Sequence, residues 1–186
     1  FKEAYCCEEE NVFVITLSAA LSGSYNSAVL AKSLYEEEYG KKNILVLDSK
    51  SASSGQLNIA MYIRELCDQG LEFDEICEKA AAYRDRMNTY FVLESLDTLK
   101  KNGRLTGLQA FFATKLNIKP VMARGIQKAL QRMAEIAVKE AGTTKDKRLV
   151  IAHCNAPERA QFMKEKLCSM AEFKEVVITD TCGVST

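Results

Sequence analysis

Two short, nearly continuous apolar runs constrain the fold of this chain more than any other feature. They cover residues 12–17 and 43–47, and the stretch between them carries apolar residues at helical spacing, with Val29, Leu30, Leu34 and Tyr35 on one face. Continuous apolar runs are typical of strands buried on both faces of a parallel sheet, and parallel neighbours need a crossover connection, usually a helix. The pattern therefore predicts a strand, a helix and a second strand of an α/β fold.

The rest of the chain continues this alternation of strands and helices. Pro157 suits the first turn of a helix, and Pro120 suits a strand end. We expect a two-domain α/β architecture, with a parallel-sheet N-terminal domain over residues 1–117 and a smaller α+β C-terminal domain over residues 118–186. Further strands are predicted at residues 89–93, 118–122, 148–153 and 175–179, and further helices at about residues 57–67, 73–87, 96–101, 108–116, 127–141 and 157–170.

The charge balance argues against a nucleic-acid-binding protein. The 186 residues carry no formal net charge, and the most basic run, residues 145–148, is interrupted by Asp146. Phosphate binding needs a clustered basic surface. The sequence also has no run near the ~20 apolar residues of a membrane span, and its first residues lack the order of a secretory signal. We therefore expect a cytoplasmic protein without a membrane span.

The cysteines do not form a recognisable metal or disulfide pattern. There are seven cysteines and one histidine, with no Cys-x-x-Cys pair. His153 and Cys154 are adjacent, but neighbours in a strand point to opposite faces, so they do not form a nucleophile and base pair. We expect reduced, buried, structural thiols and no bound metal.

Two polar loops follow the first two predicted strands. The first, residues 22–27, reads Ser-Gly-Ser-Tyr-Asn-Ser and precedes a helical pattern that begins near Ala28. The second begins at Asp48 and Ser49 and continues to Gly55. Ligands collect at the carboxyl ends of parallel strands, and a helix N-terminus binds anions, so a carboxylate or phosphate site is indicated here. The alternative is that Ser22 or Ser24 only caps the helix and Gly23 only makes the turn.

Four motifs in order resemble the DegV family of bacterial lipid-binding proteins. They are the Ser22–Ser27 loop with the preceding Ile-Thr-Leu-Ser, the strand end at Asp48-Ser49, Gly103-Arg104-Leu105, and Ile118-Lys119-Pro120-Val121. The resemblance covers nearly the whole chain from about Val12. It implies a two-domain α/β protein that buries one long-chain fatty acid. Some members of the family are the acyl-carrying subunit of fatty acid kinase and present the carboxylate to a separate ATP-using subunit.

The resemblance also assigns residues to the carboxylate site. Ser22 and the backbone of Gly23 and Ser24 match the family's carboxylate cradle, with Ser24 standing where the family usually has threonine. Arg104 matches the family's arginine near the carboxylate or the kinase-facing surface, and the alternative for Arg104 is an ordinary surface arginine. Candidate walls of the acyl tunnel, each of which is otherwise a core residue, are Phe111, Phe112, Leu116 and Ile118.

Three family segments are missing from this sequence. The family usually opens with a strand ending in Asp-Ser and a Thr-Ser loop, closes with a His-Thr-Gly-Pro-Gly type loop, and carries a hairpin after the position of Met122. About 70–80 residues of the first domain are absent on this comparison, a span typical of part of a domain. We therefore expect that the sequence is an incomplete record of a longer chain.

The leading hypothesis is a carrier that buries a long-chain fatty acid, needs no cofactor, and hands its carboxylate to a kinase subunit. One alternative is an enzyme that uses the serine-rich sheet edge to act on a phosphate or acyl compound. The chain carries no Gly-x-Ser-x-Gly elbow, no phosphate-loop lysine and no histidine placed to activate Ser22 or Ser24. A second alternative is a non-catalytic module that binds only protein.

Overall fold

The computed structural model describes residues 1–92, 118–121 and 123–181, and its strands form three parallel pairs. β1 pairs with β2 from Asn11 opposite Asn43 to Thr16 opposite Asp48, β3 pairs with β4, and β5 pairs with β6. The strands are β1 (Asn11–Thr16), β2 (Asn43–Asp48), β3 (Thr89–Phe91), β4 (Ile118–Pro120), β5 (Arg148–His153) and β6 (Glu175–Asp180). The helices are α1 (Lys2–Tyr5), α2 (Ser24–Tyr39), α3 (Ser54–Asp68), α4 (Phe73–Arg86), α7 (Ile126–Ala141) and α8 (Pro157–Met170).

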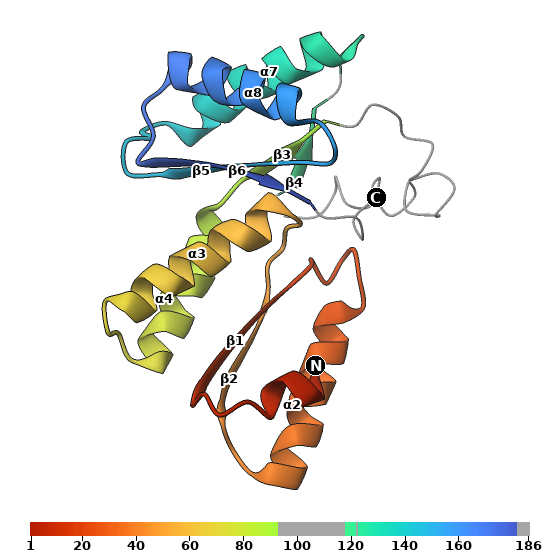
Figure 1. Ribbon diagram of the computed structural model, residues 1–186, viewed down its shortest axis with the longest axis vertical. Helices are drawn as coiled ribbons and strands as arrows, with labels where there is room; N and C mark the ends of the chain where they lie inside the picture. The colour runs from red at the N-terminus through yellow and green to blue at the C-terminus, as the bar shows by residue number, and fades with distance from the viewer. Residues whose placement is uncertain (93–117, 122, 182–186) are drawn as a thin grey trace.

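The first unit, residues 1–88, has helices on both faces of the β1–β2 pair (Figure 1). Tyr5, Ala31 and Ile44 form a small core under α2, and the Tyr5 hydroxyl donates to the carbonyl of Ala28 at 3.0 Å. The opposite face carries the larger core, in which Leu47 of β2 packs with residues of α3 and α4 such as Ile59 and Ile76. Burial on both faces explains why these strands are almost continuously apolar.

The second unit, from residue 89 onward, places α7 and α8 on one face of the β5–β6 pair (Figure 1). Its core contains Leu130, Ala134, Met163 and Leu167. Pro157 lies in the first turn of α8, as predicted. β3 and β4 pair across the domain boundary that we predicted at residue 118, and the chain between them lies outside the described residues. The boundary therefore stays a prediction.

Helix α3 contacts both units. It packs against β1 on one side and against β5 on the other, and Ile59, Ile63 and Leu66 are buried along it. Its first turn carries a capping box, in which the Ser53 side chain accepts from the backbone of Gln56 and the Gln56 side chain accepts from the backbone of Ser53. Because α3 begins at Ser54, the helix follows directly on the loop that comes after β2.

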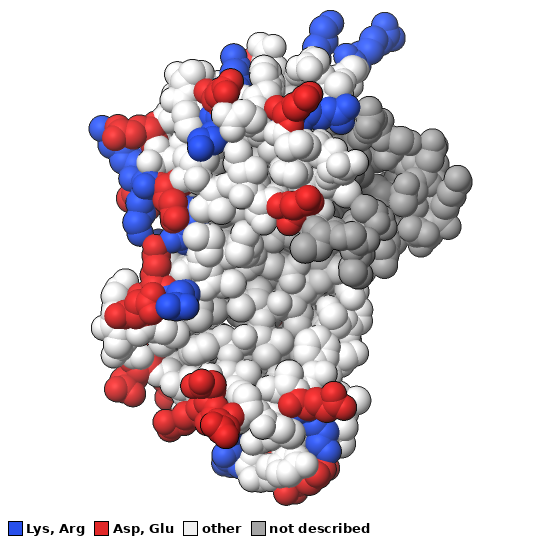
Figure 2. Space-filling model, in the orientation of Figure 1, with Lys and Arg blue, Asp and Glu red and all other residues white. Residues whose placement is uncertain are grey.

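Charged side chains lie mainly along the edges of the face shown in Figure 2, and the centre of that face is mostly neutral. Acidic and basic side chains are interspersed along these edges, including where the two units meet at the left of the view. Acidic side chains predominate along the lower edge and basic ones at the very top, so charge is not evenly balanced over this face.

Gly55 offers a test of this packing. A Cβ at position 55 would lie 1.9 Å from Ser51 Oγ and 2.8 Å from Thr89 Oγ1. We expect Gly55→Ala to lower the free energy of unfolding by about 1–3 kcal/mol, as overpacking does. Gly23→Ala is the matched control, because no atom lies within 4 Å of its Cβ position and its φ is −69°. Urea denaturation measures both, and equal losses would contradict the packing described for α3.

Candidate functional site

The candidate site lies at the carboxyl ends of β1 and β2, where two serine-rich loops meet. Because Thr16 lies opposite Asp48, both strands end at the same edge. The carbonyl of Ser18 accepts from the N–H groups of Leu21 at 2.8 Å and Ser22 at 3.1 Å, which turns the chain back toward α2. The sequence-based expectation that these two loops are neighbours is therefore confirmed.

Helix α2 begins at Ser24, so the expectation of a start near Ala28 is wrong. The first turn is closed by the Ser27 N–H, which donates to the Gly23 carbonyl at 3.0 Å, and by the Ser24 N–H, which donates to Ser22 Oγ at 3.2 Å. Ala28 is the first buried residue of the helix, and apolar periodicity therefore becomes visible only there. Residues 24–27 belong to the first helical turn and not to the loop.

The first turn of α2 presents free donors. Gly23 is the N-cap and, as a glycine, has no side chain that could cap the helix. Within the described residues, the N–H groups of Tyr25 and Asn26 meet no hydrogen-bond acceptor. Unpaired N–H groups at a helix N-terminus carry the positive end of the helix dipole. The Ser22 hydroxyl accepts from the N–H of Ser24, and among the described residues no acceptor meets the next two N–H groups, so the turn is suited to an anion.

Two serine hydroxyls at this edge are buried and meet no hydrogen-bond partner among the described residues. Ser18 Oγ and Ser24 Oγ have no hydrogen-bond partner in the part of the chain that the structure describes, and Ser18 is fully buried. A buried hydroxyl that makes no hydrogen bond is costly, and such groups often mark a ligand site. Ser18 was not among the predicted site residues, although it ends the Ile-Thr-Leu-Ser string that precedes the first loop.

Asp48 joins the two loops. Its Oδ1 accepts from the N–H of Ala19 at 3.0 Å and from the N–H of Lys50 at 2.9 Å. The N–H of Ser18 in turn donates to the carbonyl of Ser51 at 2.9 Å. Asp48 is thus a structural residue of the site, which holds the two turns in one arrangement.

The end of α4 anchors the second loop. Lys50 has a φ of 49°, and its Nζ lies 2.7 Å from Asp85 Oδ1. Hydrogen bonds from Arg84 and from Lys50 lower the pKa of Asp85 to about 2. Asp85 therefore remains ionised well below neutral pH, and its ion pair with Lys50 is not lost by protonation of Asp85 near neutral pH.

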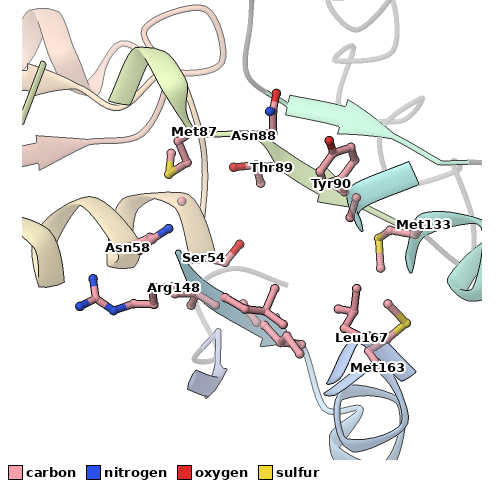
Figure 3. A pocket seen from close by; sticks show the side chains of 16 residues that line it. Ser54, Asn58, Met87, Asn88, Thr89, Tyr90, Met133, Arg148, Met163 and Leu167 are labelled. Carbon is pink, nitrogen blue, oxygen red and sulfur yellow. The ribbon is translucent and has the colours of Figure 1, made fainter. Parts of the chain in front are cut away.

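A cavity of about 160 Å³ lies between β3 and β5 (Figure 3). In the close-up, Asn58 and Arg148 lie at one end, and Met133, Met163 and Leu167 at the other. The wall of this cavity contacts the second serine loop, because Thr89 Oγ1 is 2.8 Å from Ser51 Oγ. One end of the cavity is therefore polar and the other apolar.

A second cavity of about 500 Å³ adjoins the first and shares Met87, Tyr90 and Arg148 with it. It lies between α3 and α4 on one side and the second unit on the other, and the stacked rings of Tyr62 and Tyr83 contribute to its wall. Burial raises the pKa of Tyr83, and burial together with a hydrogen bond to Glu140 raises that of Tyr90. Both phenols are therefore neutral hydrogen-bonding groups.

Several predicted site residues are not tested by the structure. Arg104, Phe111, Phe112 and Leu116 lie outside the described residues. Ile118, the fourth candidate tunnel wall, is buried in β4 but does not line either of these two cavities. The cavity walls come instead from β3, β5 and the helices around them, which sequence reasoning did not connect with a ligand.

The prediction of buried cysteines is wrong. Among the described cysteines, Cys77 is partly buried and the others are exposed, namely Cys6, Cys7, Cys67, Cys154 and Cys168. Cysteine is usually buried, but Cys67 and Cys168 lie on outward faces of α3 and α8, which their small side chains tolerate. Within the described part of the chain, no three His, Cys, Asp or Glu residues are placed to hold a metal ion. No helix there is long and apolar enough to span a membrane.

A family model and a known relative both relate this chain to the same protein family. A family model described as "Uncharacterised protein, DegV family" matches residues 1–186. A DegV domain-containing protein of Streptococcus pneumoniae is 34% identical over 188 residues, which cover 94% of this chain and 66% of that protein. The chain therefore spans somewhat less than two thirds of this relative's length.

Two solved structures are similar in fold to all or nearly all of this chain. A DegV family protein from Ruminococcus gnavus, refined with vaccenic acid, is 43% identical, with a TM-score of 0.91 over 100% of this chain and 70% of that one. The Streptococcus pneumoniae Fatty Acid Kinase (Fak) B3 protein loaded with linoleic acid is 29% identical, with a TM-score of 0.77 over 98% and 69% of the two chains.

Substitutions of Asp48 test whether its hydrogen bonds hold the two loops together at the sheet edge. Asp48→Ala removes the acceptor of two backbone N–H groups, and we expect a loss of about 1–3 kcal/mol in the free energy of unfolding. Asp48→Asn keeps an acceptor oxygen at the same place and should lose less. Denaturation by urea compares the two variants, and an Asn variant as unstable as the Ala variant would show that the hydrogen bonds of Oδ1 are not what holds the loops.

Proposed function

The chain belongs to the DegV family, and we propose that it binds a long-chain fatty acid whose carboxylate is held by Ser22, Gly23 and Ser24. The acyl chain extends into the apolar space between the two units. Arg104, which lies outside the described residues, completes the carboxylate site in this proposal.

The observation that carries the proposal is the unpartnered Ser24 hydroxyl beside the free N–H groups of α2. A fatty carboxylate accepts several hydrogen bonds and carries the negative charge that a helix N-terminus favours. Bonds to a charged acceptor are stronger than those between neutral groups. The bound head group would thus satisfy donors that the described residues leave without acceptors.

The apolar end of the smaller cavity, lined by Met133, Met163 and Leu167, supports an apolar tail. Burial of methylene groups gives about 0.8 kcal/mol each, so a sixteen-carbon chain gains roughly 10 kcal/mol before the costs of association. The cavity of about 160 Å³ is similar in volume to one of about 150 Å³ that holds a benzene ring, so it takes only part of such a chain. The adjoining cavity of about 500 Å³ is within the usual range for ligand pockets, about 300–1,000 Å³.

We further propose that the bound carboxylate is presented to an ATP-using fatty acid kinase subunit. The similarity to the Fatty Acid Kinase B3 protein supports this role. The candidate carboxylate loop lies at the edge of the sheet, where a partner would approach it. In this proposal the chain carries no cofactor of its own, because the partner supplies ATP.

The first test is direct extraction. We expect organic solvent to release close to one equivalent of a long-chain fatty acid from the purified full-length protein, as identified by mass spectrometry. Lipid-free protein should also take up labelled fatty acid. A protein that yields no lipid and binds none would refute the proposal, and turnover of a phosphate or acyl compound without a partner would favour the enzyme alternative.

The second test removes the Ser24 hydroxyl. Ser24→Ala should weaken fatty acid binding by about tenfold or more, since a hydrogen bond to a charged group is worth about 1.5–3 kcal/mol. Because this hydroxyl has no partner among the described residues, the variant should be as stable as the unmodified protein without ligand. The matched control is Ser27→Ala, an exposed serine in the same helical turn. Titration with a fluorescent fatty acid measures both, and equal affinities would exclude Ser24 from the site.

A further inference from the structure

Arg148 is a buried cation at the junction of the two units. Its side chain is only 4% exposed, although it lines both cavities. The guanidinium donates to Glu65 of α3 in the first unit and to Glu175 of β6 in the second. Glu65 also pairs with Lys174 at 3.2 Å. The two units are thus joined at Glu65 by two ion pairs.

We propose that Glu65 and Arg148 form a clasp that holds the two units closed and thereby sets the rate at which the fatty acid leaves. This inference rests on the proposed function, because it concerns release from the same cavities. Glu65 and Arg148 are positioning residues: they act by fixing α3 against β5, without contacting the head group.

The geometry supports a clasp for two reasons. The pair joins elements from the two units, beside a cavity whose walls are also divided between them. The guanidinium is buried, so loss of one carboxylate leaves a charge with fewer partners in a poorly solvated position, which is costly. Interfaces between domains of one chain otherwise favour relative motion. An ion pair at this place would therefore favour the closed arrangement of the two units over an open one.

Two substitutions, one in each glutamate that pairs with Arg148, distinguish a clasp between the units from a merely structural ion pair. Glu65→Gln removes the charge across the junction, whereas the matched control Glu175→Gln removes a charge within the second unit. In the full-length protein, we expect Glu65→Gln to speed the release of a fluorescent fatty acid about tenfold, the effect of about 1.4 kcal/mol. The control should release it within about twofold of the unmodified rate, since Glu65 still pairs with Arg148 and with Lys174 across the junction.

Hydrogen exchange on the lipid-free proteins provides a readout that does not depend on the ligand. Glu65→Gln should speed exchange in both α3 and β5, whereas Glu175→Gln should affect β5 and β6 only. Equal release rates, or equal exchange in α3, for the two variants would overturn the clasp. If the unmodified protein binds no fatty acid, the proposed function fails, and the exchange pattern alone then decides whether Glu65 holds the units together.

Discussion

The packing of α3 between β1 and β5 is the constraint on which the rest of the structure depends. Ile59, Ile63 and Leu66 are buried along this helix, and each fully buried side chain of this kind contributes about 1.5–3 kcal/mol. One helix therefore forms part of the core of the first unit and also contacts the second. The position of β5, and of the cavities beside it, follows from where α3 lies.

The start of α3 also determines how closely the serine loops approach the second unit. Gly55 leaves room for Ser51 to contact Thr89 of β3. Through Ser51 the contact continues to Ser18, whose N–H donates to the Ser51 carbonyl. The polar edge and the cavity wall are consequently parts of one hydrogen-bonded arrangement.

Much of the fold was predictable because its signals are local. Each described strand lies within a residue or two of its predicted range, since short apolar runs mark buried parallel strands directly. Helix α1 was missed because a single turn of four residues carries too little periodicity to detect. The start of α2 was misplaced because its first turn is polar and is closed by Ser22 and Gly23, not by apolar contacts.

The sequence by itself determined the alternation of strands and helices, the polar loops at the ends of the first two strands, and the resemblance to a lipid-binding family. Only the tertiary structure decided which groups meet. It buried the hydroxyls of Ser18 and Ser24 without a partner among the described residues, and it brought Arg148 to Glu65, 83 residues away. Periodicity and turn residues act over a few positions, whereas these encounters depend on how whole elements pack, and no local pattern carries that information.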